Sequence, residues 1–253
     1  MNGLNRRIDP LKDAASQIHL SSSEVSEPVF IAETFESFQG EGPWAGTASL
    51  FIRTSGCNLR CWFCDTPYTS WQPEGEQRTL DKLAKVVRQS AAEHVVITGG
   101  EPMLAAQLTE LTEICRAASR TITIETAGTV DRSVECDLMA LSPKRPNSAP
   151  DDPHWRMRHE QTRHQPAVIH SLLKRYDCIL KFVIDTQIDV ADVCTYLEEF
   201  PEVTTDRIWL MPQARTHQEL LDQTTWVKSA AEENGFRFSP RLHMEQFGDA
   251  RGV

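Results

Sequence analysis

The densest group of reactive side chains in the sequence is Cys57, Cys61 and Cys64, spaced C-x3-C-x2-C. Three close thiolates suit a structural zinc site, an iron–sulfur cluster or a knot of disulfides. Disulfides explain the pattern poorly, because the chain has seven cysteines, an odd number, and its start lacks a secretory signal. Structural zinc normally takes four ligands, and the next cysteine, Cys115, is far downstream in a helical pattern. On a 4Fe-4S cluster, three cysteines would leave one iron open for another ligand.

Six short motifs accompany or overlap these cysteines, and together they carry a family resemblance. They are Phe38-Gln-Gly-Glu-Gly42, Phe51-Ile-Arg53, Cys64-Asp-Thr66, Thr98-Gly-Gly-Glu-Pro102, Glu125-Thr-Ala-Gly128 and Ser142-Pro-Lys144. The cysteine spacing followed by the Gly-Gly-Glu-Pro stretch resembles radical S-adenosylmethionine (SAM) enzymes. The whole set is similar to the 7-carboxy-7-deazaguanine synthase (QueE-like) family of the queuosine and deazapurine pathway. The resemblance runs from about Phe30 to the C-terminus.

The resemblance implies a 4Fe-4S cluster on the three catalytic cysteines, with SAM bound at the open iron. By the same resemblance, the residues that contact SAM are Phe63, Cys64, Asp65, Gly99, Gly100, Glu101, Glu125, Ser142, Pro143, Lys144 and Gln213. Plainer explanations exist for several of them. Two glycines after a buried strand suit an ordinary strand-to-helix turn, and a lone glutamate there often caps a helix or is solvated.

A second set of residues could read a small polar substrate. Arg53 interrupts an apolar strand, and a buried guanidinium needs either a bound carboxylate or an internal Asp or Glu. Gln39 and Glu41 could pair with donors and acceptors of a heterocycle, although the same stretch could be a flexible polar loop. The resemblance implies substrate binding by Phe38, Gln39, Gly40, Glu41, Arg53, Thr98 and His243. It also makes Thr66 a candidate ligand of Mg²⁺, with a helix-capping hydroxyl as the alternative.

The activity implied by the resemblance is the conversion of 6-carboxy-5,6,7,8-tetrahydropterin to 7-carboxy-7-deazaguanine with loss of ammonia. Expected partners are an electron donor such as flavodoxin or ferredoxin and a second copy of the chain in a homodimer. Two other functions fit parts of the pattern. An activating enzyme that generates a glycyl radical on a partner protein shares the cysteine spacing, and a zinc-stabilised binding module needs only the cysteines.

Composition and charge argue against a nucleic-acid-binding protein and a membrane-spanning protein. The chain has 253 residues, of which 40% are hydrophobic and 25% charged, enough for one large α/β domain. The net charge is −10 and no dense Lys/Arg stripe with interleaved aromatics occurs, so we expect no nucleic-acid partner. No apolar run approaches the ~18 residues of a membrane span. We therefore predict no membrane partner and a cytoplasmic location.

The elements that must position these residues follow from periodicity. Residues 1–27 are predicted to be a polar N-terminal extension with a short helix over Leu11–Leu20, and residues 28–253 to be one domain. A strand over Val29–Ala32 is followed by a Gly-rich loop over 35–46. Later strands and helices alternate, which favours a parallel sheet with crossover helices. The count suggests an incomplete (β/α)6-type barrel, the fold that the resemblance also implies.

One stretch breaks this rhythm, at about residues 145–166. It holds several prolines and histidines without a clean period, and we predict a long loop. The histidines at 154, 159, 164 and 170 have a spacing that could suggest a metal site, but we expect them to be solvated.

Overall fold

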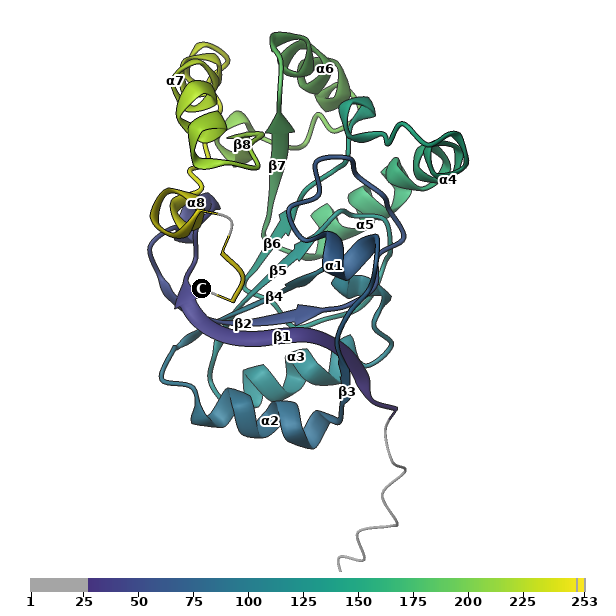
Figure 1. Cartoon of the computed structure of the whole chain (residues 1–253), viewed down its shortest axis with the longest axis vertical. Coiled ribbons are helices and arrows are strands. Elements are labelled where there is room, and N and C mark those ends of the chain that lie inside the picture. Colours follow the sequence, from purple (N-terminus) through teal and green to yellow (C-terminus); the bar gives the residue numbers. More distant parts are fainter. Residues whose placement is uncertain (1–26, 249, 253) are drawn as a thin grey trace, which may run out of the picture.

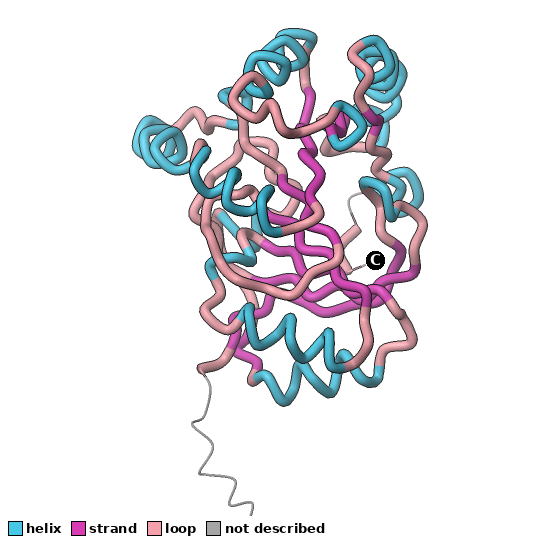
Figure 2. Tube along the Cα trace, turned by 180° about the vertical axis from the view of Figure 1, so that it is seen from behind, coloured by secondary structure: helices cyan, strands magenta, loops and turns pink. Residues whose placement is uncertain are grey.

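The computed structural model describes residues 27–248 and 250–252 (Figure 1). The helix predicted over Leu11–Leu20, and nearly all of the proposed extension, lie outside the described residues. The rest of the chain forms an α/β fold around one curved sheet, with helices outside the sheet (Figures 1 and 2). No helix in the described part of the chain is long and apolar enough to cross a membrane.

The sheet has nine strands in the order β3-β1-β2-β4-β5-β6-β7-β8-β9. All neighbours from β2 to β9 are parallel, whereas β1 is antiparallel to both β2 and β3. The open order, with β3 and β9 at the two edges, is that of a partial barrel, as predicted. The strands are β1 (Val29–Phe38), β2 (Ala48–Thr54), β3 (Glu76–Arg78), β4 (His94–Gly99), β5 (Thr121–Thr126), β6 (Leu138–Leu141), β7 (Cys178–Ile184), β8 (Ile208–Pro212) and β9 (Arg237–Phe238).

Helices fill most of the crossovers, although β5 and β6 are joined by residues 127–137 without one. Figure 1 shows α2 and α3 together below the first strands, and α6 and α7 at the other end of the sheet. The α-helices are α1 (Pro67–Ser70), α2 (Leu80–Gln89), α3 (Leu108–Ala117), α4 (Pro153–Arg163), α5 (Pro166–Arg175), α6 (Gln187–Leu197), α7 (His217–Glu233) and α8 (Leu242–Phe247). Short 3-10 turns occupy Gly42–Trp44, Pro102–Leu104, Pro146–Ser148 and Thr205–Arg207.

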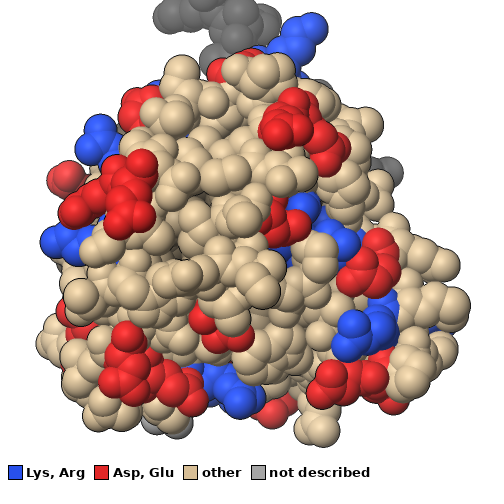
Figure 3. All heavy atoms as spheres, turned by 90° about the horizontal axis from the view of Figure 1, so that it is seen from above, with Lys and Arg blue, Asp and Glu red and all other residues tan. Residues whose placement is uncertain are grey.

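The apolar stripes of the helices meet the sheet in one main core. Leu83 and Val87 of α2 and Leu111 of α3 are fully buried in the same cluster as Val95 and Ile97 of β4. Burying each such side chain contributes about 1.5–3 kcal/mol, so this layer fixes the strands whose ends carry the site. On the face seen from above in Figure 3, acidic and basic groups are interspersed and no broad area is basic.

Two elements differ from the sequence prediction. Strand β1 continues to Phe38, so part of the expected Gly-rich loop is strand, paired with β2. The prediction of a long loop over 145–166 is wrong, because half of that stretch is helix α4. Its start is set by Asp152, whose side chain accepts the N–H of Trp155 at 2.9 Å, and by Pro153 in the first turn.

The histidines of this region do not share one environment. His154 and His170 are exposed, as expected, and His164 is half-buried. His159 is 1% exposed, so its predicted solvation is wrong. In the described part of the chain, these histidines belong to no group of three or more His, Cys, Asp or Glu side chains that could hold a metal ion.

Candidate active site

One cavity of about 510 Å³ opens at the carboxyl ends of the parallel strands. Because these ends share one edge of the sheet, side chains distant in sequence meet there. All the predicted site residues line the cavity except Glu101 and Pro143, which are buried behind it. The lining residues are Phe38, Gln39, Gly40, Glu41, Arg53, Cys57, Cys61, Phe63, Cys64, Asp65, Thr66, Thr98, Gly99, Gly100, Glu125, Ser142, Lys144, Gln213 and His243.

The loop after β2, residues 55–66, brings the three thiols to one wall of the cavity; we call it the cysteine loop. Leu59, Phe63 and Ala127 pack around the thiols as a small apolar cluster. Burial raises the pKa of Cys57 and of Cys61 to about 12, because a thiolate is poorly solvated there. These thiols need a bound cation to ionise, and iron ions of a cluster supply that charge.

The arrangement of the thiols bears on the kind of metal. A structural zinc ion normally takes four protein ligands. Of the described cysteines, three line the cavity and the others lie elsewhere. In an iron–sulfur cluster each thiolate binds its own iron, so three cysteines leave one iron of a 4Fe-4S cluster open. The donor set therefore suits an iron–sulfur cluster better than zinc.

The end of β4 packs directly against the cysteine loop. A Cβ on Gly100 would lie 2.3 Å from the Gly56 carbonyl oxygen, and one on Gly99 would lie 2.3 Å from that of Thr54. The N–H of Gly100 donates to Thr54 O at 3.2 Å, and that of Glu101 donates to Gly56 O at 2.9 Å. Because these N–H groups are used internally, this stretch can offer a ligand its carbonyl oxygens, which suit a cationic amino group.

Glu101 holds two strand ends together. Its carboxylate accepts the N–H of Met103 at 3.0 Å, the N–H of Ala127 at 2.8 Å and the hydroxyl of Thr126 at 2.7 Å. It is 1% exposed, and burial raises its pKa despite these donors. Its predicted contact with SAM stays a prediction, since the carboxylate is turned into the protein.

After β6, the side chain of Lys144 folds back onto Ser142. Its ammonium donates to the carbonyl oxygen at 2.8 Å and to the hydroxyl at 2.9 Å. This ammonium also favours the charged forms of Cys57 and Cys61. Gln213, after β8, is buried on the same cavity.

Glu125, which lines the same cavity as the thiols, is held by two uncharged donors. The amide of Gln39 donates to one carboxylate oxygen at 3.0 Å, and the hydroxyl of Thr98 donates to the other at 2.9 Å. Three predicted site residues from three separate segments are thus hydrogen-bonded together.

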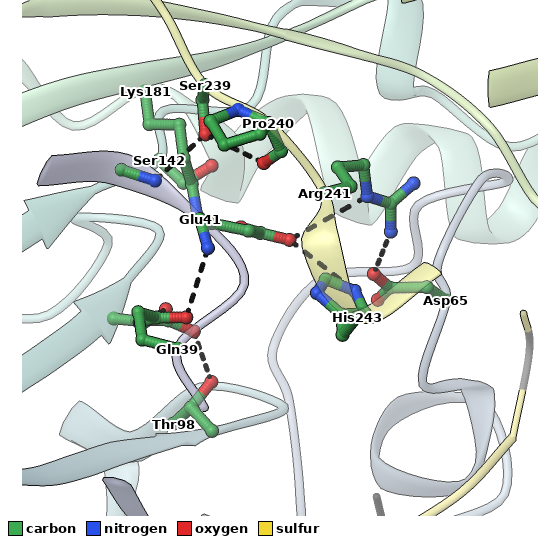
Figure 4. A network of polar contacts seen from close by, with 12 residues as sticks. Gln39, Glu41, Asp65, Thr98, Ser142, Lys181, Ser239, Pro240, Arg241 and His243 are labelled. Atoms are coloured by element: carbon green, nitrogen blue, oxygen red, sulfur yellow. Dashed lines mark hydrogen bonds and ion pairs between the residues drawn. The ribbon is translucent and has the colours of Figure 1, made fainter. Parts of the chain in front are cut away.

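Glu41 is the centre of a charged network (Figure 4). Its carboxylate pairs with the ammonium of Lys181, with Arg241 Nε at 3.7 Å and with His243 Nε2 at 3.9 Å. Burial alone would raise the pKa of Glu41, but Lys181, His243 and Arg241 together lower it to about 2. Arg241 also donates to Asp65 at 2.7 Å, which ties the network to the cysteine loop.

The pKa values of Lys181 and His243 are shifted in opposite directions in this network. Burial disfavours the ammonium of Lys181, yet the carboxylates of Glu41 and Glu125 outweigh it and raise the pKa. Burial lowers the pKa of His243, which favours the neutral ring. A Cβ on Gly40 would lie 2.0 Å from His243 Nδ1, so only glycine lets the ring approach here.

Arg53 pairs with an internal carboxylate, one of the two alternatives considered from the sequence. Its Nε donates to Glu33 of β1 at 2.7 Å, and Glu33 also accepts the hydroxyl of Tyr68 at 2.8 Å. The two terminal nitrogens of Arg53 donate to none of the described residues, so the fork toward the cavity can still take a carboxylate.

Thr66 begins helix α1, but its side chain makes no capping hydrogen bond there. Its hydroxyl lies 3.9 Å from the sulfur of Cys64 and accepts from the Thr69 hydroxyl at 3.3 Å. Phe38 packs against Phe247 with ring centroids 5.6 Å apart.

Sequence reasoning missed Lys181 and Arg241. Lys181 interrupts an apolar strand just as Arg53 does, so the argument applied to Arg53 would have found it. Arg241 stands two positions before His243, and no pattern in the sequence distinguishes it from a surface arginine.

Comparison with known proteins gives consistent matches. The model of the radical SAM superfamily matches residues 51–177, half of the chain. The 7-carboxy-7-deazaguanine synthase of Rhodopirellula baltica is 38% identical over 258 residues, covering 100% of both chains. That of Halobacterium salinarum is 41% identical over 233 residues, covering 87% of this chain and 91% of the relative.

Solved structures share the fold at lower identity. QueE from Escherichia coli superposes with a TM-score of 0.60 at 24% identity, covering 84% of this chain and 93% of that chain. SuiB from Streptococcus suis, bound to its precursor peptide SuiA, gives 0.55 at 15% identity, covering 74% and 47%. At these identities the likeness concerns the fold.

Proposed function

The chain belongs to the 7-carboxy-7-deazaguanine synthase family of the radical SAM superfamily, and we propose that it converts 6-carboxy-5,6,7,8-tetrahydropterin to 7-carboxy-7-deazaguanine with loss of ammonia. The observation that carries the proposal is the shared cavity. Three thiols in cluster spacing and a set of groups suited to a carboxylated heterocycle line the same space of about 510 Å³.

The thiol wall fits the cofactors. Cys57, Cys61 and Cys64 would hold a 4Fe-4S cluster, and the carbonyls of the β4 end would receive the amino group of SAM. When bound and supplied with one electron by an external donor, these cofactors would provide the radical chemistry that begins with removal of a hydrogen atom from the substrate. Phe63 and its apolar neighbours keep water from this wall, and Ser142 and Lys144 would fix the polar end of SAM.

A second part of the cavity lining, which we call the substrate wall, fits the pterin. We assign the free fork of Arg53 to the substrate carboxylate, which it can grip in a bidentate manner. Glu41 is held ionised, so it accepts hydrogen bonds from the ring N–H and amino groups. Gln39 and Thr98 give this wall a fixed pattern of donors and acceptors, because both are hydrogen-bonded to Glu125, the residue predicted to contact SAM. Fixing the heterocycle in one pose is the main contribution of these residues to catalysis.

The proposal also includes a magnesium ion, an electron donor and a second copy of the chain. Thr66 offers a hydroxyl to Mg²⁺, a cation that prefers oxygen ligands and keeps substrate and water in its shell. We expect an electron donor of the flavodoxin or ferredoxin kind and a homodimer. Seven free cysteines and an iron–sulfur cluster suit the reducing cytoplasm.

The test is anaerobic reconstitution with iron and sulfide, followed by dithionite, SAM, Mg²⁺ and the tetrahydropterin, with the product identified by mass. We expect the deazaguanine product and a loss of at least roughly 10³-fold in Cys61→Ala, because removal of a cluster ligand removes the chemistry. Cys194→Ala, at an exposed thiol outside the cavity, is the matched control.

Other outcomes would select the alternatives. Formation of 5′-deoxyadenosine with an unchanged pterin would keep the radical SAM chemistry and contradict the substrate, which would favour a glycyl-radical activating enzyme. A colourless protein that binds one zinc ion and no iron would favour the binding module.

A further inference from the structure

Three arginines within or near the cysteine loop have no carboxylate partner among the described residues. Arg60, Arg158 and Arg215 form no ion pair with any described residue, whereas most arginines in the described part of the chain do. The chain as a whole carries a net charge of −10. These three guanidinium groups therefore add positive charge without a carboxylate partner to a protein that is acidic as a whole.

Aromatic rings lie under these arginines. The guanidinium of Arg60 lies 4.5 Å from the centre of the Trp155 ring on α4, and that of Arg158 lies 5.6 Å from the same ring. Arg215 lies 5.5 Å from the ring of Trp62, which is 38% exposed and stands between two of the cysteines. We call these five side chains the α4 patch.

The nearby acidic residues do not cancel the patch. Asp151 pairs with Arg156 at 3.5 Å, and Glu160 pairs with Arg163 at 2.7 Å. Asp152 accepts the N–H that starts helix α4. The remaining charge of the patch is positive and carried by arginine and tryptophan, two residue types enriched in protein interfaces.

The patch is joined to the cysteine loop through a short path. The ring of Trp155 meets that of Trp71 edge-on, with centroids 6.4 Å apart. The indole N–H of Trp71 donates to the carbonyl of Cys61 at 3.0 Å. One ring contact and one hydrogen bond therefore connect the surface of α4 to a proposed cluster ligand.

Helix α4 is also fixed to the loop, which keeps the patch in place. His159 accepts the N–H of Arg60 at 3.2 Å, and its other ring nitrogen bonds the hydroxyl of Ser148 at 2.8 Å. The indole of Trp62 donates to Asn147 O at 2.7 Å. A rigid surface of this kind loses little entropy on binding.

We propose that the α4 patch is the docking surface for a small electron-carrier protein whose redox group is ringed by acidic side chains. The inference rests on the proposed function, which requires an external one-electron donor. In the transfer, the carrier is oxidised by one electron and the cluster is reduced by one. Docking at the patch brings the donor to the side where the cysteine loop meets the surface, and the opposite charges steer the encounter.

The experiment compares two reductants on the same full-length variants. Arg158→Glu reverses an exposed charge of the patch, and Arg88→Glu reverses an exposed arginine of α2, on the far side of the molecule in Figure 1. We expect Arg158→Glu to weaken binding of flavodoxin by roughly fivefold to tenfold at low salt, with or without the cluster, and to slow flavodoxin-driven turnover similarly. Turnover driven by dithionite should not change, Arg158→Lys should behave as the wild type, and Arg88→Glu should change neither.

The outcomes separate the two proposals. Equal flavodoxin binding in Arg158→Glu and Arg88→Glu would overturn the docking surface. So would an equal loss of turnover with both reductants, which would mean that Arg158 has a structural role. Failure of the wild type to convert the pterin with dithionite would instead overturn the proposed function, and binding of the carrier could still be measured.

Discussion

The two walls of the cavity are built on different electrostatic plans. The thiol wall is apolar, and burial raises the pKa of its cysteines, so its charges depend on what binds there. The substrate wall carries its own balanced charges, with Glu41 held among Lys181, Arg241 and His243. The thiol wall is thus completed by a cofactor, whereas the substrate wall is organised before any ligand arrives. A preorganised wall can hold a substrate without rearranging.

The substitution Lys181→Met is the strongest test of whether the two walls are independent. It leaves the buried carboxylate of Glu41 without its closest cation, and one partner lost from a buried pair costs about 3–5 kcal/mol of stability. We expect the KM for the pterin to rise roughly 10- to 100-fold. Binding of SAM, which belongs to the thiol wall, should be unaffected, as measured by calorimetry on the reconstituted enzyme.

The controls for Lys181 separate charge from folding. Lys181→Arg keeps the cation, and the double variant Lys181→Met with Glu41→Gln removes the unpaired charge and should recover much of the lost stability. If the double variant were as unstable as the single one, Lys181 would not act through Glu41. A loss of SAM affinity equal to the loss of pterin affinity would show that the walls are not independent.

A smaller effect is expected from His159, which supports the thiol wall through α4. Burial lowers its pKa from the ordinary 6.5 to about 4. Below pH 6.5 the unfolded chain therefore binds this proton and the folded chain does not, so stability falls as the pH drops from 6.5 toward 4. Between pH 7 and 5 we expect the wild type to lose about 1–2 kcal/mol more than His159→Gln in urea unfolding.

The comparison for His159 is His154→Gln, which changes an exposed ring in the same helix. This variant should keep the pH dependence of the wild type. Identical pH slopes in the wild type and His159→Gln would mean that the buried ring takes up its proton in the folded state, against the expectation.

The smallest effect is expected at the edge of the substrate wall. Arg251 pairs with Glu74 at 2.9 Å and lies over the ring of Tyr68 at 3.7 Å, but its side chain is 42% exposed. Exposed pairs contribute about 0–1 kcal/mol, so Arg251→Ala should lower the free energy of unfolding by less than 1 kcal/mol. It should raise the KM for the pterin only a few-fold. A larger rise, seen in steady-state kinetics at constant stability, would make Arg251 a direct substrate contact.

The sequence predicted which residues line the cavity better than it predicted the contacts among them. The cysteines and the Gly-Gly-Glu-Pro stretch are short motifs that follow strand ends. Motifs of this kind can be recognised from the sequence alone. Arg53 was found because a cation in an apolar strand is conspicuous, but its partner Glu33 comes from the antiparallel neighbour β1, which no local pattern reveals. Arg241 meets Glu41 only because the sheet curves.

Helix α4 escaped prediction for a different reason. Its residues are mostly polar and only His159 is buried, so it has no apolar stripe to detect. Its start was nevertheless visible, since Asp152 and Pro153 are a cap and a first-turn residue. The helix could have been predicted by giving more weight to this N-terminal cap than to the absence of an apolar stripe.

The Glu41 network also has a consequence for how the molecule folds. Lys181 and Glu41 are separated by 140 positions, and Arg241 and Asp65 by 176. Contacts between residues so far apart in sequence stabilise the fold only after the intervening strands are in register, because closing so large a loop is entropically unfavourable. We therefore expect the Glu41 network to be the last part of the cavity to form during folding and the first to open during unfolding. Weakening it would speed unfolding while leaving the rate of folding nearly unchanged.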